Sequence, residues 1–146
     1  MRFILFLVAV AAVAQAPSSD KAAFKPQPVG NLKQVMRGIL LPNSDAIFKV
    51  ADAAPKTDKE WADVQNSAIA IAEAAALIAM PGRLRENGEP VPVTRPDWIK
   101  FSQELADAAK ATYKAAQSKS QDAVNMSTDR LTDACDSCHM VYRDKR

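Results

Sequence analysis

Residues 57–82, TDKEWADVQNSAIAIAEAAALIAMPG, contain the clearest helical pattern in this chain of 146 residues. Thr57 and Glu60 fit a capping box, in which two side chains satisfy backbone donors at the start of a helix. Apolar residues then recur at spacings of three and four, the pattern of one buried helix face: Trp61, Val64, Ala68, Ile71, Ala75 and Ile78. Pro81 and Gly82 end the pattern. This stretch predicts a long helix packed against other elements.

A second helical pattern precedes it in residues 29–41, VGNLKQVMRGILL. Its apolar seam has the same three-four spacing and consists of Val29, Leu32, Met36 and Ile39. Pro42 follows directly, and a proline inside a helix removes a backbone donor and clashes with the preceding turn. We therefore expect this helix to end or kink at Pro42 and a short helix to restart within residues 43–53.

Two more helices are expected in the C-terminal half. Thr94 is the predicted cap of the first, and the second is expected to run from Ser120 to Tyr142. Their apolar seams are formed by Trp98, Phe101, Leu105, Ala108 and Thr112, and by Val124, Leu131, Cys135, Cys138 and Tyr142. No strand pattern competes with these helices, and their short connections favour antiparallel neighbours. The sequence therefore predicts an all-α fold, an antiparallel up-down-up-down four-helix bundle.

The N-terminus has the pattern of a cleaved signal peptide at residues 1–16. Arg2 precedes an apolar run at residues 3–13, and Ala14, Gln15 and Ala16 supply the small-x-small pattern of a signal-peptidase site. A membrane anchor is the alternative, but this run is shorter than the ~20 apolar residues of a spanning helix. We therefore expect an exported mature chain of one domain, residues 17–146, with no membrane segment.

Charge and composition argue against several classes of function. Loss of Arg2 with the signal peptide lowers the formal charge from +2 to +1, and a nucleic-acid-binding face would need clustered basic residues with stacking aromatics. His139 is the sole histidine, which leaves none for a hydrolytic triad once it has another role. The basic stretches at residues 82–85 and 142–146 are either solvated or a docking site for an acidic partner. We expect no nucleic-acid partner and no enzymatic activity.

Both cysteines and the histidine lie within five residues near the C-terminus: Cys135, Cys138 and His139. Their order, C-x-x-C-H, is the pattern for covalent attachment of c-type haem. On a helix that advances about 100° per residue, Cys138 lies about 60° to one side of Cys135 and His139 about 40° to the other. The two thiols then reach the vinyl groups of one porphyrin while the imidazole faces its iron.

Three other interpretations of this motif compete. Structural zinc normally takes four ligands, and this chain has two cysteines and one histidine. A thioredoxin-like redox pair normally lies near a strand-helix-strand pattern, which the sequence lacks. A local disulfide suits an exported protein but leaves the position of His139 unexplained. Covalently attached haem c is therefore the cofactor that the motif favours.

The segment CDSCHMVYR, residues 135–143, resembles the end of the last helix in the class II c-type cytochromes, the cytochrome c prime family. Class I cytochromes c carry their haem motif near the N-terminus, whereas here it lies near the C-terminus. The resemblance implies a four-helix bundle with one covalent haem c and His139 as its proximal axial ligand. It also implies a periplasmic location, because bacterial c-type haem is attached outside the cytoplasmic membrane.

Within that family, the face of the iron opposite the histidine separates two functions. A methionine there gives a low-spin electron carrier, and Met36 on the first helix is its counterpart in this chain. The resemblance therefore implies electron transfer with redox partner proteins. The alternative is a five-coordinate protein that binds nitric oxide or carbon monoxide, in which Leu32 and Ile39 guard a vacant distal site and Met36 fills apolar space.

Three basic residues are candidate contacts for the haem propionates. Members of the family often have an arginine on the first helix near the propionates, and this chain has Lys33 and Arg37 there. Arg143, one turn after His139, either pairs with a propionate or is solvated. Homodimers formed through the first two helices are common in the family, but a proline at position 42 can alter that face, so dimerisation is left open as an expectation.

Overall fold

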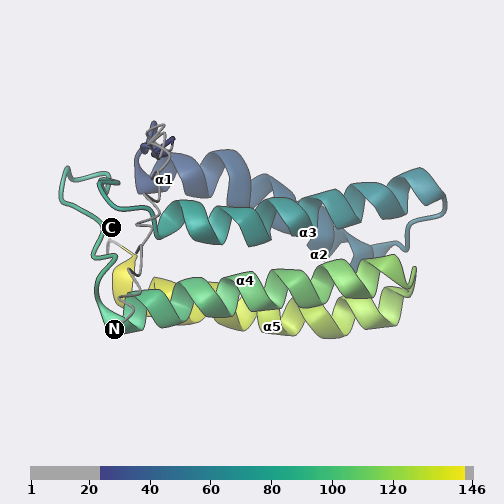
Figure 1. Cartoon of the computed structure of the whole chain (residues 1–146). Helices are drawn as coiled ribbons and strands as arrows, with labels where there is room; N and C mark the ends of the chain where they lie inside the picture. Colours follow the sequence, from purple (N-terminus) through teal and green to yellow (C-terminus); the bar gives the residue numbers. More distant parts are fainter. Residues whose placement is uncertain (1–23, 144–146) are drawn as a thin grey trace, which may run out of the picture.

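Residues 24–143 are described by the computed structural model, and they form helices joined by loops, with no strand among them (Figure 1). The elements in chain order are α1 (Leu32–Val35), the π-helical segment η1 (Met36–Leu40), α2 (Leu41–Asp52), α3 (Asp58–Ile78), α4 (Pro96–Gln117) and α5 (Gln121–Tyr142). The predicted all-α class is confirmed for this range. The predicted signal peptide lies outside the described residues. Within residues 24–143, no helix is both long and apolar enough to cross a bilayer.

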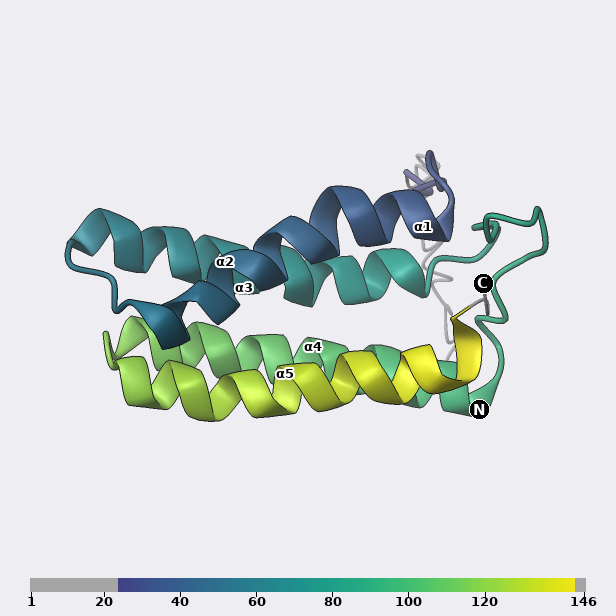
Figure 2. The same ribbon diagram turned by 180° about the vertical axis from the view of Figure 1, so that it is seen from behind.

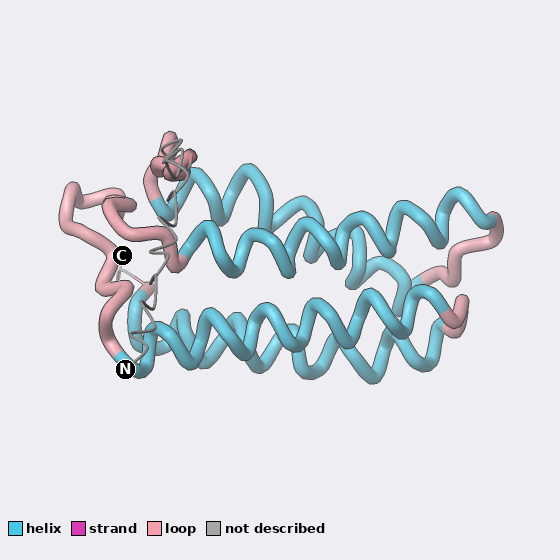
Figure 3. Tube along the Cα trace, in the orientation of Figure 1, coloured by secondary structure: helices cyan, strands magenta, loops and turns pink. Residues whose placement is uncertain are grey.

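The helices pack as four rods, with α1, η1 and α2 forming one continuous rod (Figures 1 and 2). α3 packs along α4 and α4 along α5, while α2 contacts both α3 and α5. The Gln121 side chain donates from Nε2 to the Val50 carbonyl at 2.7 Å and ties the start of α5 to the end of α2. The loops at residues 53–57 and 118–120 lie at one end of the rods, and the long loop at residues 79–95 lies at the other (Figure 3).

The long loop between α3 and α4 holds the start of the first rod in place. The buried Arg83 side chain donates to a carbonyl in the last turn of α3 and to the Gly30 carbonyl. The Leu32 amide donates to the Leu84 carbonyl at 2.8 Å. These bonds fix α1 beside the end of α3.

The first rod corrects the predictions that the helix ends at Pro42 and that a short helix restarts after it. The helix neither ends nor restarts there: η1 leads directly into α2, and Pro42 lies in the first turn of α2. The Leu41 amide donates to the Met36 carbonyl, five residues back, which is the π-helical pattern. Val29 was also placed wrongly on the helical seam, because the helix starts after Asn31 and Val29 is fully exposed.

Local capping explains where the other helices begin. Thr57 Oγ1 accepts from the Glu60 amide at 3.2 Å, and the Glu60 carboxylate accepts from the Thr57 amide at 3.0 Å, so the predicted capping box is confirmed. Ser120 caps α5 through its side chain, also as predicted. The prediction of Thr94 as a cap is wrong: Arg95 is the N-cap of α4, because the residue after it is the proline that begins the helix.

The core runs along the length of the rods. All six residues of the predicted α3 seam are buried. The largest fully buried side chains are Trp98, Ile47, Ile71, Leu131, Val124 and Thr112. Alanines with no exposed surface, such as Ala68 and Ala109, let neighbouring helices approach closely. The core therefore holds α3, α4 and α5 together.

Truncation of a core side chain tests this packing. Ile47→Ala should lower the free energy of unfolding by about 2–5 kcal/mol, because the buried residue leaves a cavity that neighbours fill incompletely. Ile69→Ala is the matched control, since Ile69 is 41% exposed, and it should change stability by no more than about 0.5 kcal/mol. Urea denaturation followed by far-UV circular dichroism measures both. Equal losses at the two positions would contradict the burial pattern.

Candidate functional site

A cavity of about 740 Å³ lies at the end of the rods that carries the long loop. Its walls are mostly apolar, and its size is within the ~300–1,000 Å³ range of small-molecule and cofactor sites. Its lining residues from the first rod, α3 and the long loop are Leu32, Lys33, Met36, Arg37, Leu40, Leu41, Ser44, Ile71, Ile78, Arg85 and Glu86. Those from α4 and α5 are Trp98, Phe101, Leu105, Leu131, Ala134, Cys135, Cys138, His139, Tyr142 and Arg143.

The first rod and the C-terminal turns of α5 stand apart across this cavity. No Cα atom of α1 or η1 comes within 8 Å of a Cα atom of α5, although α2 contacts α5 elsewhere. α1 and η1 rest on α3 instead. The rods therefore separate at this end, and the cavity occupies the space between them.

The last turns of α5 bring the motif to the cavity. Cys135, Cys138 and His139 are half-buried and all line it, as the sequence predicts for residues that share one helix face. Val124, Leu131 and Ala134 are buried on α5, and their packing turns this side of the helix inward. The motif therefore lies in a binding cavity rather than on an open surface.

Met36 lines the same cavity from the first rod. Of the methionines in residues 24–143, it alone does so: Met126 and Met140 are largely exposed, and Met80 lies beyond α3. Leu32 also lines the cavity, whereas Ile39 packs against the core. Of the two apolar residues expected to guard an open distal site, one is therefore at the cavity and the other is not.

Aromatic residues form part of the wall beside the motif. The Tyr142 ring lies edge-on to the rings of Trp98 and Phe101, with centroid distances of 4.8 Å and 6.2 Å. Among the described residues, the buried Trp98 Nε1 has no hydrogen-bond partner. A buried donor without a partner is costly, so a cavity beside it suits a bound group that offers an acceptor. Sequence reasoning assigned Trp98 to the core and missed this feature, because it depends on packing between α4 and α5.

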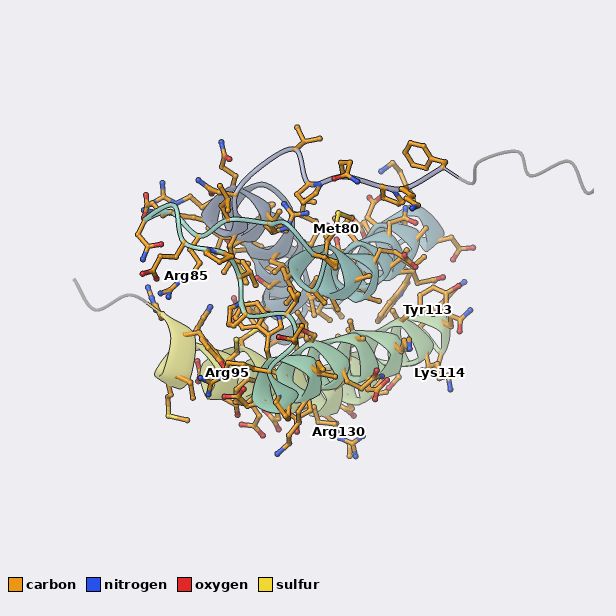
Figure 4. All side chains as sticks on the ribbon, turned by 60° about the vertical axis from the view of Figure 1, so that its left-hand side comes forward. Met80, Arg85, Arg95, Tyr113, Lys114 and Arg130 are labelled. Carbon is orange, nitrogen blue, oxygen red and sulfur yellow. The ribbon has the colours of Figure 1, made fainter. Side chains whose placement is uncertain are left out.

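Basic side chains gather around the cavity. The predicted Lys33, Arg37 and Arg143 all line it, and so does Arg85, which the sequence analysis placed in a basic stretch that is either solvated or a docking site. Figure 4 shows Arg85 on the long loop, at the end of the molecule where α5 ends. Lys33 forms an ion pair with Glu86 across two elements far apart in sequence. These residues give the cavity a region suited to carboxylates.

Burial sets the protonation of the motif. It raises the pKa of Cys135 and raises the pKa of Cys138 to about 11, so both are thiols at neutral pH. Reactive cysteines have the opposite environment, one that lowers the pKa. Burial also lowers the pKa of His139, with a smaller contribution from the charge of Arg143. A neutral imidazole is the form that binds a metal.

No family model matches the chain, and neither a curated protein nor a solved structure matches it. Within residues 24–143, no group of three or more His, Cys, Asp or Glu side chains is arranged to hold a bare metal ion. The function is therefore inferred from the cavity and the motif that lines it.

An ion pair at the start of α4 supports the aromatic wall. Arg95 donates from Nε and Nη2 to the Asp97 carboxylate at 3.0 Å and 2.9 Å, and its guanidinium lies 5.7 Å from the centre of the Tyr142 ring. These hydrogen bonds are the main cause that lowers the pKa of Asp97 below its ordinary value of 3.8. Folding therefore gains stability from Asp97 above pH 3.8, and this gain is lost as the pH falls further.

Asp97→Asn tests this linkage. The difference in free energy of unfolding between the natural protein and the variant should be constant near neutral pH and should shrink as the pH falls below 3.8, the ordinary pKa of the group. Urea denaturation at a series of pH values measures it. A difference that does not change across this series would show that the Asp97 carboxylate has no special environment in the folded protein.

Proposed function

We propose that this chain is an electron-transfer cytochrome of the class II type, with one covalently attached haem c in the cavity. One observation carries the proposal: the C-x-x-C-H motif of α5 and Met36 of η1, from opposite ends of the sequence, line the same cavity of about 740 Å³. Apolar walls, basic residues and an unpartnered indole donor make the cavity chemically suited to a haem, which is apolar but carries two propionates.

Each residue has a role that follows from its chemistry. Cys135 and Cys138 would hold the haem as thioethers, and His139 would be its proximal ligand. Met36 would be the distal ligand, with a thioether that raises the reduction potential. The haem, when bound, supplies reversible one-electron oxidation and reduction of its iron. Lys33, Arg37, Arg85 and Arg143 are the candidates to pair with the propionates.

The remaining features of the proposal concern topology and location. The loops alternate between the two ends of the rods (Figure 3), which supports an up-down-up-down antiparallel order. The signal-peptide pattern and the need to attach haem c outside the cytoplasm support a periplasmic location. The protein would then exchange electrons with redox partner proteins rather than catalyse a reaction of its own.

A second candidate function is binding of nitric oxide or carbon monoxide at an open iron. It is favoured by Leu32 and Leu40, which line the cavity one helical turn on either side of Met36. If Met36 packs with these leucines instead of reaching the iron, an external ligand would enter a site with apolar walls. The two candidates differ in whether a protein side chain must first leave the iron.

Met36→Ala distinguishes them. We expect the ferrous variant to bind carbon monoxide at least about tenfold faster than the natural protein, because no thioether must be displaced. Its reduction potential should also fall, since methionine ligation raises it. Stopped-flow absorption and a potentiometric titration measure the two effects.

Met126→Ala is the matched control, because Met126 is 74% exposed on α5 and does not line the cavity. It should leave both the rate and the potential unchanged. If the natural protein already binds carbon monoxide as fast as Met36→Ala does, the distal site is open and the second candidate is correct.

A further inference from the structure

The first rod lines the cavity over residues 32–44, and one row of its lining residues has a spacing of four. Leu32, Met36, Leu40 and Ser44 all line it. On an ideal α-helix, residues four apart are offset by about 40°, so three such steps turn the last side chain about 120° from the first. Lys33, Arg37 and Leu41 line the cavity beside this row, so the lined face of the rod is broad. On an uninterrupted α-helix Met36 would lie about 80° from Ser44, toward the edge of that face.

The π-helical segment η1 removes this rotation. In η1 the Leu41 amide bonds to the carbonyl of Met36, five residues back, and not to the residue four back. A turn closed in this way contains more residues than the 3.6 of an α-helix, so the step from Met36 to Leu40 offsets the roughly 40° advance of the α-helical step from Leu40 to Ser44. The row continues along one wall because η1 lies in its middle and begins at Met36.

Pro42 supplies a physical cause for η1. It has no amide hydrogen, and in an α-helix its ring would clash with the Gly38 carbonyl, four residues back. The wider turn just before Pro42 relieves that clash. In addition, the Asn43 side chain donates from Nδ2 to the Ile39 carbonyl at 2.7 Å, which adds a hydrogen bond within this irregular turn.

We propose that Pro42 is a positioning residue for Met36: it maintains the π-helical turn that keeps Met36 on the cavity wall. The inference rests on the proposed function, because the position of Met36 matters only if Met36 is the distal ligand. Pro42 itself does not line the cavity, so its effect passes through the backbone.

Pro42→Ala is the first test. The new amide at position 42 can donate to the Gly38 carbonyl, which converts η1 to an α-helix and turns Met36 away from the wall. In the haem-loaded protein, the ferrous form should bind carbon monoxide about tenfold faster than the natural protein does. Alanine is a better helix former than proline, so the variant should fold. NMR hydrogen exchange should show that the new amide exchanges slowly.

Deletion of Gly38 in the Pro42→Ala background is the second test. With one residue fewer, Met36 lies four residues before Leu41. The hydrogen bond from the Leu41 amide to the Met36 carbonyl, which closes a π-helical turn in the natural protein, then closes an α-helical turn. The position of Met36 relative to Leu41 is thereby restored. A Cβ built at Gly38 would meet no atom within 4 Å, so no neighbouring element packs against this position. Carbon monoxide binding should return to within about twofold of the natural rate, as expected for a position that acts through geometry.

Pro55→Ala, at the opposite end of the rods, is the control. Its ferrous form should bind carbon monoxide at the same rate as the natural protein. If Met36→Ala speeds carbon monoxide binding and Pro42→Ala does not, Met36 is a ligand but the positioning role is wrong. Rapid hydrogen exchange of the amide at position 42 in Pro42→Ala would show that this amide forms no helical bond, and Pro42 would then not be the cause of η1. If Met36→Ala has no effect, both the ligand assignment and the positioning role fail. If deletion of Gly38 does not restore slow carbon monoxide binding, the number of residues between Met36 and Leu41 does not set the position of Met36.

Discussion

The separation of the first rod from the C-terminal turns of α5 is the constraint on which the site depends. α3, α4 and α5 share a continuous core, and α2 closes it at the other end, but α1 and η1 make no close backbone approach to α5. Apolar side chains that face each other across such a space lose the contacts that normally repay their burial. Their arrangement is explained if a large apolar group completes the core, and the motif on α5 is of the kind that attaches one.

Much of this architecture follows from sequence pattern. The three-four spacing of Trp61 through Ile78 predicted α3 with its buried face, and Thr57 and Ser120 predicted two helix starts. These features are local, since they depend on residues within a turn or two of each other. The placement of Cys135, Cys138 and His139 on one face also followed from helical spacing, and the structure adds that this face lines a cavity.

Other features depend on contacts between segments far apart in the chain. Pro42 was expected to end or kink a helix, but η1 leads directly into α2, and the Asn43 side chain donates to the Ile39 carbonyl within this turn. Arg85 and Glu86 reach the cavity because Arg83 and Leu84 tie their loop to the start of α1. No pattern within the loop itself indicates that attachment. The unpartnered Trp98 indole similarly emerges from the packing of α4 against α5.

The intact mass of the protein purified after export tests the central claim most directly. The account predicts the mass of the mature chain plus one haem, with the added mass retained after denaturation and located by peptide mapping on the segment that contains Cys135 and Cys138. Loss of the haem on denaturation would contradict covalent attachment. A mass equal to the chain alone, or lower by the two hydrogens of a disulfide, would contradict the account as a whole.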